Sequence, residues 1–171
     1  MYHEGMEQKA LADIFGRWNS AGVQYLVVGG LAVVAHGYAR LTMDTDVVLG
    51  PEVGNLRKAL EVLGGLGFKP RAPVPLEDFA DAAKRRSWAL EKHMLVFTVW
   101  SSAYPLTEVD LFLECPFPSF DKAYERALKR DVAPGVPATF AGLEDLIALK
   151  RKAGRPKDLE DIRMLRELGR E

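Results

Sequence analysis

Three aspartates occur at spacings that suit the binding of divalent cations. Asp44 and Asp46 flank one residue in the segment 44–49 (DTDVVL), and Asp110 lies in the segment 108–114 (EVDLFLE). Because side chains alternate between the two faces of a β-strand, Asp44 and Asp46 would share one face. Carboxylates this close repel one another unless a cation lies between them, and Mg²⁺ binds such oxygens together with substrate phosphates. The pattern therefore predicts a metal site suited to phosphoryl transfer.

An adjacent glycine pair precedes the first two aspartates. Gly29-Gly30 ends the apolar run Tyr25–Val28 and opens a segment of small residues with helical character. Glycine lets a backbone approach phosphate closely, and a helix N-terminus offers free N–H groups. Taken alone, the glycines fit a plain tight turn and the acids fit a solvent-facing sheet surface. Taken together, they favour a nucleoside triphosphate held against Mg²⁺.

The hydrophobic periodicity predicts helices and strands that alternate early in the chain and strands that cluster later. The predicted helices cover 6–20, 31–36, 52–66, 76–85, 120–128, 143–153 and 157–168. The predicted strands cover 23–28, 45–49, 88–93, 94–100 and 108–113, with a loop or irregular edge strand at 70–75 and a hairpin at 132–140. We therefore expect an α/β (α+β) fold in which helices flank a mixed twisted sheet and a helical pair ends the chain.

Length and composition favour one soluble domain. We expect the 171 residues to form a core at 1–141 and a C-terminal helical extension at 142–171 packed on it. The net charge of −1 gives no global attraction to nucleic acid or membrane. The single cysteine, Cys115, excludes an internal disulfide, and the charged N-terminal segment differs from a signal peptide. No apolar run approaches the ~20 residues that span a bilayer, so we expect a cytoplasmic protein without membrane contact.

The motifs in combination resemble the DNA polymerase beta-like nucleotidyltransferase superfamily. The resemblance rests on Gly29-Gly30, 13 intervening residues, the pair Asp44-x-Asp46 and the later Asp110. The longer match GGLAVVAHGYARLTMDTD and the tail KRKAGRPKDLED are similar to a small bacterial branch related to abortive-infection and toxin–antitoxin toxins. Residues 70–105 and 115–140 have no counterpart in this resemblance.

The resemblance implies a minimal nucleotidyltransferase core and a specific reaction. A nucleoside monophosphate would pass from a triphosphate such as ATP to an acceptor hydroxyl, and pyrophosphate would be released. Asp44 and Asp46 would bind two Mg²⁺ ions, or Mn²⁺ in their place. Asp110 would bind the catalytic ion and activate the acceptor, while Gly29 and Gly30 would contact the triphosphate. Such a reaction depends mainly on positioning and on neutralising charge.

Several cations are further candidates for the nucleotide site. Arg40 lies between the glycines and the acids and would pair either with phosphate or with Asp44 or Asp46. In the basic C-terminal cluster 150–157, Lys150 and Lys157 are the candidates for triphosphate contact by the resemblance. The alternative for this cluster is a solvated charged face. We expect the two aspartates of the last helix, Asp158 and Asp161, to pair with these cations.

The acceptor is left open by the sequence. A toxin-like enzyme would modify RNA or a protein and would have an antitoxin partner, whereas a resistance enzyme would modify an aminoglycoside or lincosamide antibiotic. A third alternative is an inactive domain that serves as a binding partner or antitoxin. A basic rim formed by 150–157 and 84–86 would favour RNA. An acidic pocket beside the site, built from Glu77, Asp78 or Asp81, would favour a cationic drug.

Overall fold

The computed structural model describes residues 2–169, without the side chains of residues 2–4 and 6. The helices are α1 (Tyr2–Ser20), α2 (Gly29–Ala35), α3 (Val53–Gly65), α4 (Ala82–Glu91), α5 (Phe120–Glu125), α6 (Leu143–Ala153) and α7 (Pro156–Leu168), and a short 3₁₀ helix, η1, covers Leu76–Ala80. The strands are β1 (Tyr25–Val28), β2 (Asp44–Leu49), β3 (Lys69–Pro70), β4 (Val96–Trp100), β5 (Glu108–Phe112), β6 (Leu128–Ala133) and β7 (Val136–Phe140).

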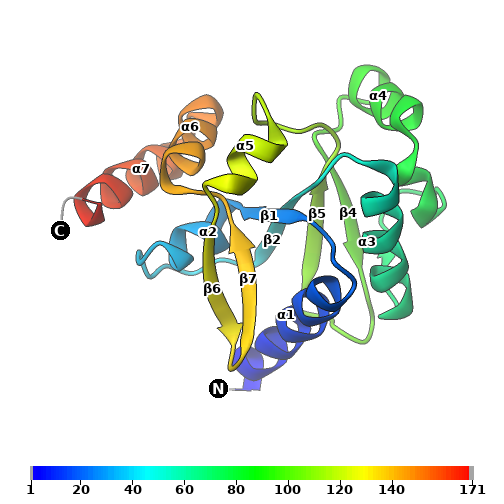
Figure 1. Ribbon diagram of the computed structural model, residues 1–171, viewed down its shortest axis with the longest axis horizontal. Helices are drawn as coiled ribbons and strands as arrows, with labels where there is room; N and C mark the ends of the chain where they lie inside the picture. Colours follow the sequence, from blue (N-terminus) through cyan, green and yellow to red (C-terminus); the bar gives the residue numbers. More distant parts are fainter. Residues whose placement is uncertain (1, 170–171) are drawn as a thin grey trace.

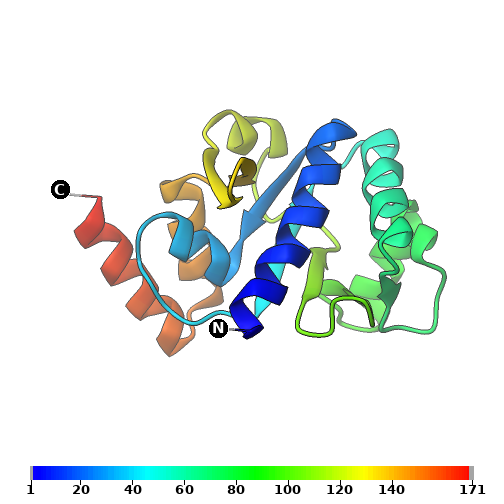
Figure 2. The same cartoon turned by 90° about the horizontal axis from the view of Figure 1, so that it is seen from below.

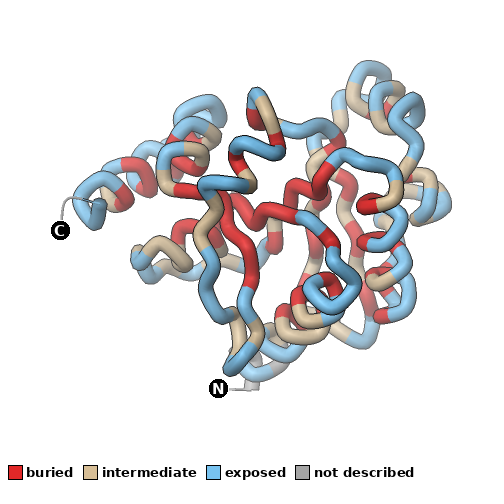
Figure 3. The backbone as a smooth tube through the Cα atoms, in the orientation of Figure 1, coloured by how far each residue is buried: buried red, intermediate tan, exposed pale blue. Residues whose placement is uncertain are grey.

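The seven strands form one mixed sheet in the order β3-β4-β5-β2-β1-β7-β6 (Figure 1). The pairs β2–β5 and β1–β7 are parallel, and the other four neighbouring pairs are antiparallel. The middle of the sheet is buried, whereas the outer turns of the helices are exposed (Figure 3). This arrangement confirms the expected mixed α/β fold with flanking helices.

One face of the sheet packs against α1 and α3. Tyr25 in β1 points to this face, and its ring lies 5.2 Å from that of Phe15 and 5.1 Å from that of Trp18, both in α1. The indole N–H of Trp18 donates to the carbonyl of Ala59 in α3 at 3.1 Å. These aromatic side chains are buried and together join two helices to the central strands.

The same face continues over β4, where η1 and α4 cover it. Phe97 of β4 stacks on Trp88 of α4 at 5.2 Å and lies 5.3 Å from Phe79 of η1. Thr98, the next residue in β4, therefore points to the opposite face. Figure 2 shows α2, α6 and α7 at one end of the molecule and α3 and α4 at the other.

The predicted strand at 88–93 is wrong, because these residues continue helix α4 as far as Glu91. The side chain of Asp81 accepts hydrogen bonds from the backbone N–H groups of Ala83 and Lys84, and so caps the helix. This cap also splits the helix predicted at 76–85, since η1 ends at Ala80. Within α4 only Trp88 is fully buried, so a single aromatic contact decides which way the helix faces.

The hairpin predicted at 132–140 forms from β6 and β7, but β6 begins earlier, at Leu128. We expected a helix over 120–128, but α5 ends at Glu125 and Leu128 belongs to β6. The C-terminal helical pair is present as α6 and α7, which contact each other, and α6 also contacts α2. Residues 170 and 171 of the expected extension lie outside the described residues. Within the described chain no helix is both long and apolar enough to cross a membrane.

Candidate active site

Asp46 and Asp110 lie directly beside one another on the neighbouring parallel strands β2 and β5. Two residues earlier, Asp44 pairs in the same register with Glu108. Because facing residues of adjacent strands project to the same side, these four carboxylates share one face of the sheet. It is the face opposite the buried Val47 and the helices α1 and α3. The structure therefore places Asp44, Asp46 and Asp110 on one face of the sheet, with Asp46 and Asp110 directly side by side.

Burial and negative charge dominate the environment of Asp46. Burial raises the pKa of this carboxyl to about 6, and the negative charges of Asp110 and Asp44 act in the same direction. The cations Lys150 and Arg155 oppose these effects without cancelling them. A carboxylate whose ionised form is destabilised by burial and by like charges is stabilised by a bound cation.

Asp110 experiences a similar environment with one compensating contact. Burial raises its pKa above the ordinary value, and the charges of Asp44 and Glu108 contribute to this rise. The hydroxyl of Thr98 donates to Oδ1 of Asp110 at 2.5 Å and partly lowers the pKa. Thr98 is directly opposite Asp110 in the antiparallel β4–β5 pair.

The aspartate pair can be tested for its fit to a metal ion. Among the described residues, no three side chains of His, Cys, Asp or Glu already gather as ligands of one ion. Mg²⁺, however, is often held by one or two carboxylates and completes its shell with water and substrate phosphates. Asp46 and Asp110 offer two such carboxylates side by side, and the raised pKa of Asp46 shows that their charge is not balanced by the chain. The donor set therefore fits an ion that the phosphates of a nucleotide would help to hold.

The glycine pair packs against the acids and the loop that follows α2. Gly29 has a positive φ of 67°, and a Cβ atom at this position would overlap the carboxylate of Asp46. A Cβ at Gly30 would overlap the hydroxyl of Thr42 and the guanidinium of Arg40. Both glycines are thus required by close packing within the chain itself. This packing brings the turn into direct contact with the carboxylate of Asp46.

Arg40 pairs with an acid of the last helix. Its Nε lies 3.1 Å from Oδ1 of Asp161, and its Nη2 donates to Oδ2 of the same residue at 3.1 Å. From the sequence, the expected partner of Arg40 is either a phosphate or one of Asp44 and Asp46. The structure pairs Arg40 with neither of these two acids. Arg40 instead ties the loop between α2 and β2 to α7.

Lys150 is only 5% exposed and is the centre of a buried ion-pair network. Its Nζ lies 2.7 Å from Oδ2 of Asp161 and 3.4 Å from Oδ1 of Asp158. Arg155 binds Asp158 as well, with Nε 2.7 Å from Oδ2. Asp158 and Asp161 thus pair with the basic cluster, as we expected. Lys157 differs from Lys150, because its side chain is exposed at the start of α7.

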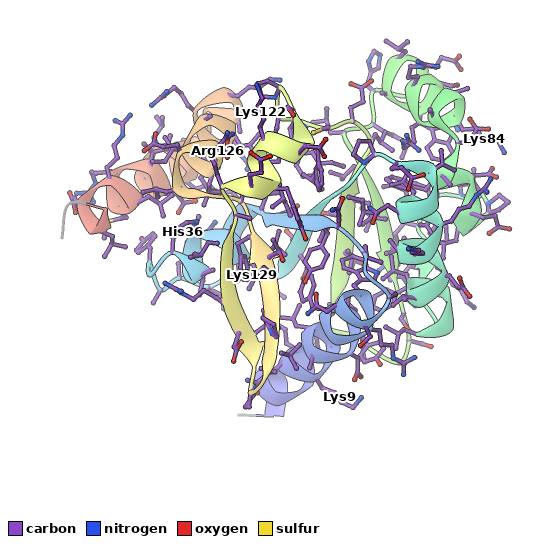
Figure 4. The ribbon with its side chains drawn as sticks, in the orientation of Figure 1. Lys9, His36, Lys84, Lys122, Arg126 and Lys129 are labelled. Atoms are coloured by element: carbon purple, nitrogen blue, oxygen red, sulfur yellow. The ribbon has the colours of Figure 1, made fainter. Side chains whose placement is uncertain are left out.

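Residues 84–86, the second segment of the expected basic rim, lie far from residues 150–157. Lys84 pairs with Asp78 at 2.7 Å, and Arg85 donates to the backbone carbonyls of Phe79 and Leu113. Figure 1 shows α4, the helix of Lys84, at the opposite end of the molecule from α6 and α7, and Figure 4 labels Lys84 at that end. Residues 84–86 and 150–157 therefore do not form one continuous basic rim.

The acidic pocket considered for a cationic drug is not beside the aspartates either. Glu77, Asp78 and Asp81 line a depression between α3, η1 and the start of α4. These helices cover the Phe97 face of the sheet, whereas Asp110 points to the other face. Neither the basic residues 84–86 nor this acidic depression thus lies next to the three aspartates.

Some residues next to the site were missed by the sequence analysis. Glu108 and Trp100 face one another across β5 and β4, on the same side of the sheet as Asp110. The guanidinium of Arg71 lies 4.7 Å from the ring centroid of Trp100 and forms an ion pair with Glu108. Alternation within 96–100 predicts that Thr98 and Trp100 share a face, but the sequence does not show which strand lies beside them.

Comparison with known proteins shows a likeness of fold. No protein-family model and no curated protein sequence matches the chain. A solved structure of the lincosamide antibiotic adenylyltransferase LnuA with bound lincomycin has a TM-score of 0.57 at 14% identity, over 88% of this chain and 90% of that one. The structure of ANT(2")-Ia in complex with adenylyl-2"-tobramycin has a TM-score of 0.58 at 15% identity, over 92% of this chain and 86% of that one. The chain therefore has a nucleotidyltransferase fold.

Proposed function

We propose that the protein is a metal-dependent nucleotidyltransferase that moves a nucleoside monophosphate from a triphosphate to an acceptor hydroxyl and releases pyrophosphate. The observation that carries this proposal is the register of Asp46 with Asp110 on adjacent parallel strands, with Asp44 on the same face. The fold shared with two antibiotic-modifying enzymes supports it.

The three aspartates divide the chemistry between them. Asp44, Asp46 and Asp110 would hold Mg²⁺, which would neutralise the charge that develops on the phosphates. Asp110 would accept the proton of the acceptor hydroxyl, and its raised pKa suits this role. The acceptor oxygen would then form a bond to the α-phosphorus while the bond to the bridging α–β oxygen breaks. The electron pair of that bond leaves with pyrophosphate.

The triphosphate would occupy the side of the aspartates toward α2, α6 and α7. Lys150 is close enough to Asp46 to lower its pKa, so its charge would also reach phosphates bound beside Asp46. We propose Gly29, Gly30 and Arg40 as further contacts, together with the exposed Lys157. The described contacts of Arg40 and Lys150 are with acids of α7, which would hold the two cations at the edge of the site.

A small molecule is the acceptor that the observations favour. Both compared enzymes were solved with a small antibiotic or its adenylylated product. In the present chain, Glu108 and Trp100 flank Asp110, and the basic residues 84–86 lie at the far end of the molecule. RNA or a protein is the second candidate, with an antitoxin as its partner, because the exposed cations Arg151, Lys152 and Lys157 remain on the other flank.

Labelled nucleotides test the proposal and its two acceptor classes. The protein is incubated with Mg²⁺ and ATP, CTP, GTP or UTP carrying an α-phosphate label, with aminoglycosides, lincosamides, total RNA or a cell lysate as acceptors. We expect label on a small molecule with wild type and none with Asp46→Asn. Label on RNA or protein alone would select the second candidate. A wild-type chain that releases no pyrophosphate from any triphosphate would support the inactive binding partner.

A further inference from the structure

Thr98 makes the one hydrogen bond from another side chain that the described structure shows for the carboxylate of Asp110. The two residues are direct partners in the antiparallel pair of β4 and β5. Facing side chains in such a pair have Cβ atoms ~5 Å apart, which lets a short hydroxyl reach a short carboxylate. The distance of 2.5 Å between Thr98 Oγ1 and Asp110 Oδ1 is that of a charge-assisted bond.

From this geometry we infer that Thr98 is a positioning residue, which holds the Asp110 carboxylate in the orientation that nucleotidyl transfer requires. The inference rests on the proposed function, since it assigns Thr98 a role through Asp110. The bond engages Oδ1 and leaves Oδ2 to meet a metal ion or the acceptor hydroxyl. Without it, the carboxylate could rotate about its Cβ–Cγ bond, because this torsion is broad and has no strong staggered minima.

The two side chains of the pair are held unequally. Thr98 is β-branched, so it occupies few rotamers in a strand, and the adjacent Phe97 and Val99 are buried in the core on the other face. The backbone of Thr98 is thereby fixed on both sides by apolar packing. A hydroxyl on a rigid strand can therefore impose its direction on the less restricted carboxylate. Loss of such orientation reduces turnover more than nucleotide affinity, because small misplacements of reacting groups slow the chemical step.

A pair of isosteric substitutions tests the role of the hydroxyl. Thr98→Val removes the oxygen and keeps the branched shape, whereas Thr98→Ser keeps the oxygen. Thr107→Val is the matched control, because the hydroxyl of Thr107 is buried and, among the described residues, has no hydrogen-bond partner. All four proteins are assayed for nucleotidyl transfer and for pyrophosphate release with water as the acceptor, which needs no identified acceptor. Thermal unfolding is measured in parallel.

We expect Thr98→Val to lower kcat by about 10- to 100-fold, as the loss of a hydrogen bond to a charged group does, with KM for the triphosphate changed less than about twofold. Thr98→Ser should recover most of kcat, and Thr107→Val should behave as wild type. Equal kcat for wild type and Thr98→Val would overturn the inference, as would a Thr98→Ser variant as slow as Thr98→Val. A wild type that cleaves no triphosphate would contradict the proposed function itself, and with it the role of Thr98.

Discussion

The carboxylate of Asp46 lies against the backbone of Gly29, so close that a methyl group at position 29 would occupy the same space. Gly29 also has a positive φ of 67°, which a residue with a β-carbon adopts at a cost of about 1 kcal/mol. The contact joins the first turn of α2 to the face of β2 that carries Asp44 and Asp46. It explains why a glycine must precede the aspartate pair in this chain, independently of any phosphate.

Replacement of this glycine should therefore displace Asp46. We expect Gly29→Ala to lower transfer activity by about 100-fold or more, because Asp46 would have to move from the site that it shares with Asp110. Gly135→Ala is the control, since Gly135 has a φ of 73° but nothing within 4 Å of an added Cβ. Both variants have backbone strain from the positive φ, but only Gly29→Ala has the clash with Asp46. Comparing their activity and thermal unfolding therefore separates the two effects. Equal activity of the two would show that the contact with Asp46 does not matter for transfer.

The burial of Asp46, together with repulsion from Asp110 and Asp44, predicts that Asp46→Asn stabilises the metal-free protein. The folded state raises the pKa of Asp46 to about 6, so ionising this group opposes folding, and the opposition grows as pH rises through 6. Well below the ordinary Asp pKa of 3.8, the wild-type carboxyl is protonated in both states and the difference between the two proteins should vanish. Melting temperatures at several pH values, in EDTA, measure the difference. A difference that is constant with pH would show that Asp46 is not destabilised by charge.

Lys150 should be required for stability as well as for activity. Lys150→Met removes the ammonium that Asp158 and Asp161 share and leaves each buried acid with one guanidinium partner, Arg155 or Arg40. We therefore expect a loss of stability of at most about 3–5 kcal/mol, the cost of a fully unpaired buried charge. Lys152→Met is the matched control, because Lys152 lies on the same helix with an exposed side chain. Urea unfolding of both variants provides the comparison. If Lys150→Met unfolds at the same urea concentration as Lys152→Met, the network does not hold α6 to α7.

The surface beside Asp110 should determine acceptor affinity. Trp100 and Glu108 face each other on the same side of the sheet as Asp110, and neither is one of the proposed nucleotide contacts. We expect Trp100→Ala to raise KM for the acceptor by about tenfold through loss of aromatic contact area, while KM for the triphosphate stays within about twofold. Steady-state kinetics with the acceptor found in the labelling experiment provide the test. An effect on the triphosphate alone would place the nucleotide, and not the acceptor, on this surface.

The shared face of the three aspartates and the two C-terminal helices could be predicted, because each depends on a pattern within one short segment of the sequence. The alternation around Asp46 and Asp110 is decided by apolar residues of the same strand. Helix α6 ends at Gly154, which has a left-handed backbone conformation, and α7 begins with Pro156. The sequence correctly placed Asp158 and Asp161 near the basic cluster, since Asp158 lies three positions after Arg155 and Asp161 lies four positions after Lys157.

The features that could not be predicted depend on contacts between distant segments. The segment that begins at Trp88 was predicted as a strand, because a buried aromatic residue fits a helix or a strand equally well. Only the stacking of Trp88 on Phe97 shows how α4 is oriented. The partnership of Thr98 with Asp110 requires the register of β4 with β5, which alternation within one strand does not specify. The ion pair of Arg40 with Asp161 joins residues 121 positions apart, so the local sequence around either residue does not predict it.

Binding of Mn²⁺ in the presence of a nonhydrolysable nucleoside triphosphate tests the central claim most directly. Electron paramagnetic resonance counts the ions that leave solution as protein is added, with the variants Asp46→Asn and Asp110→Asn alongside wild type. We predict that wild type binds Mn²⁺ tightly only when the triphosphate is present and that each variant loses this binding while remaining folded. Nucleotide-dependent Mn²⁺ binding that is equal in wild type and both variants, or absent from wild type, would contradict the assignment of the three aspartates.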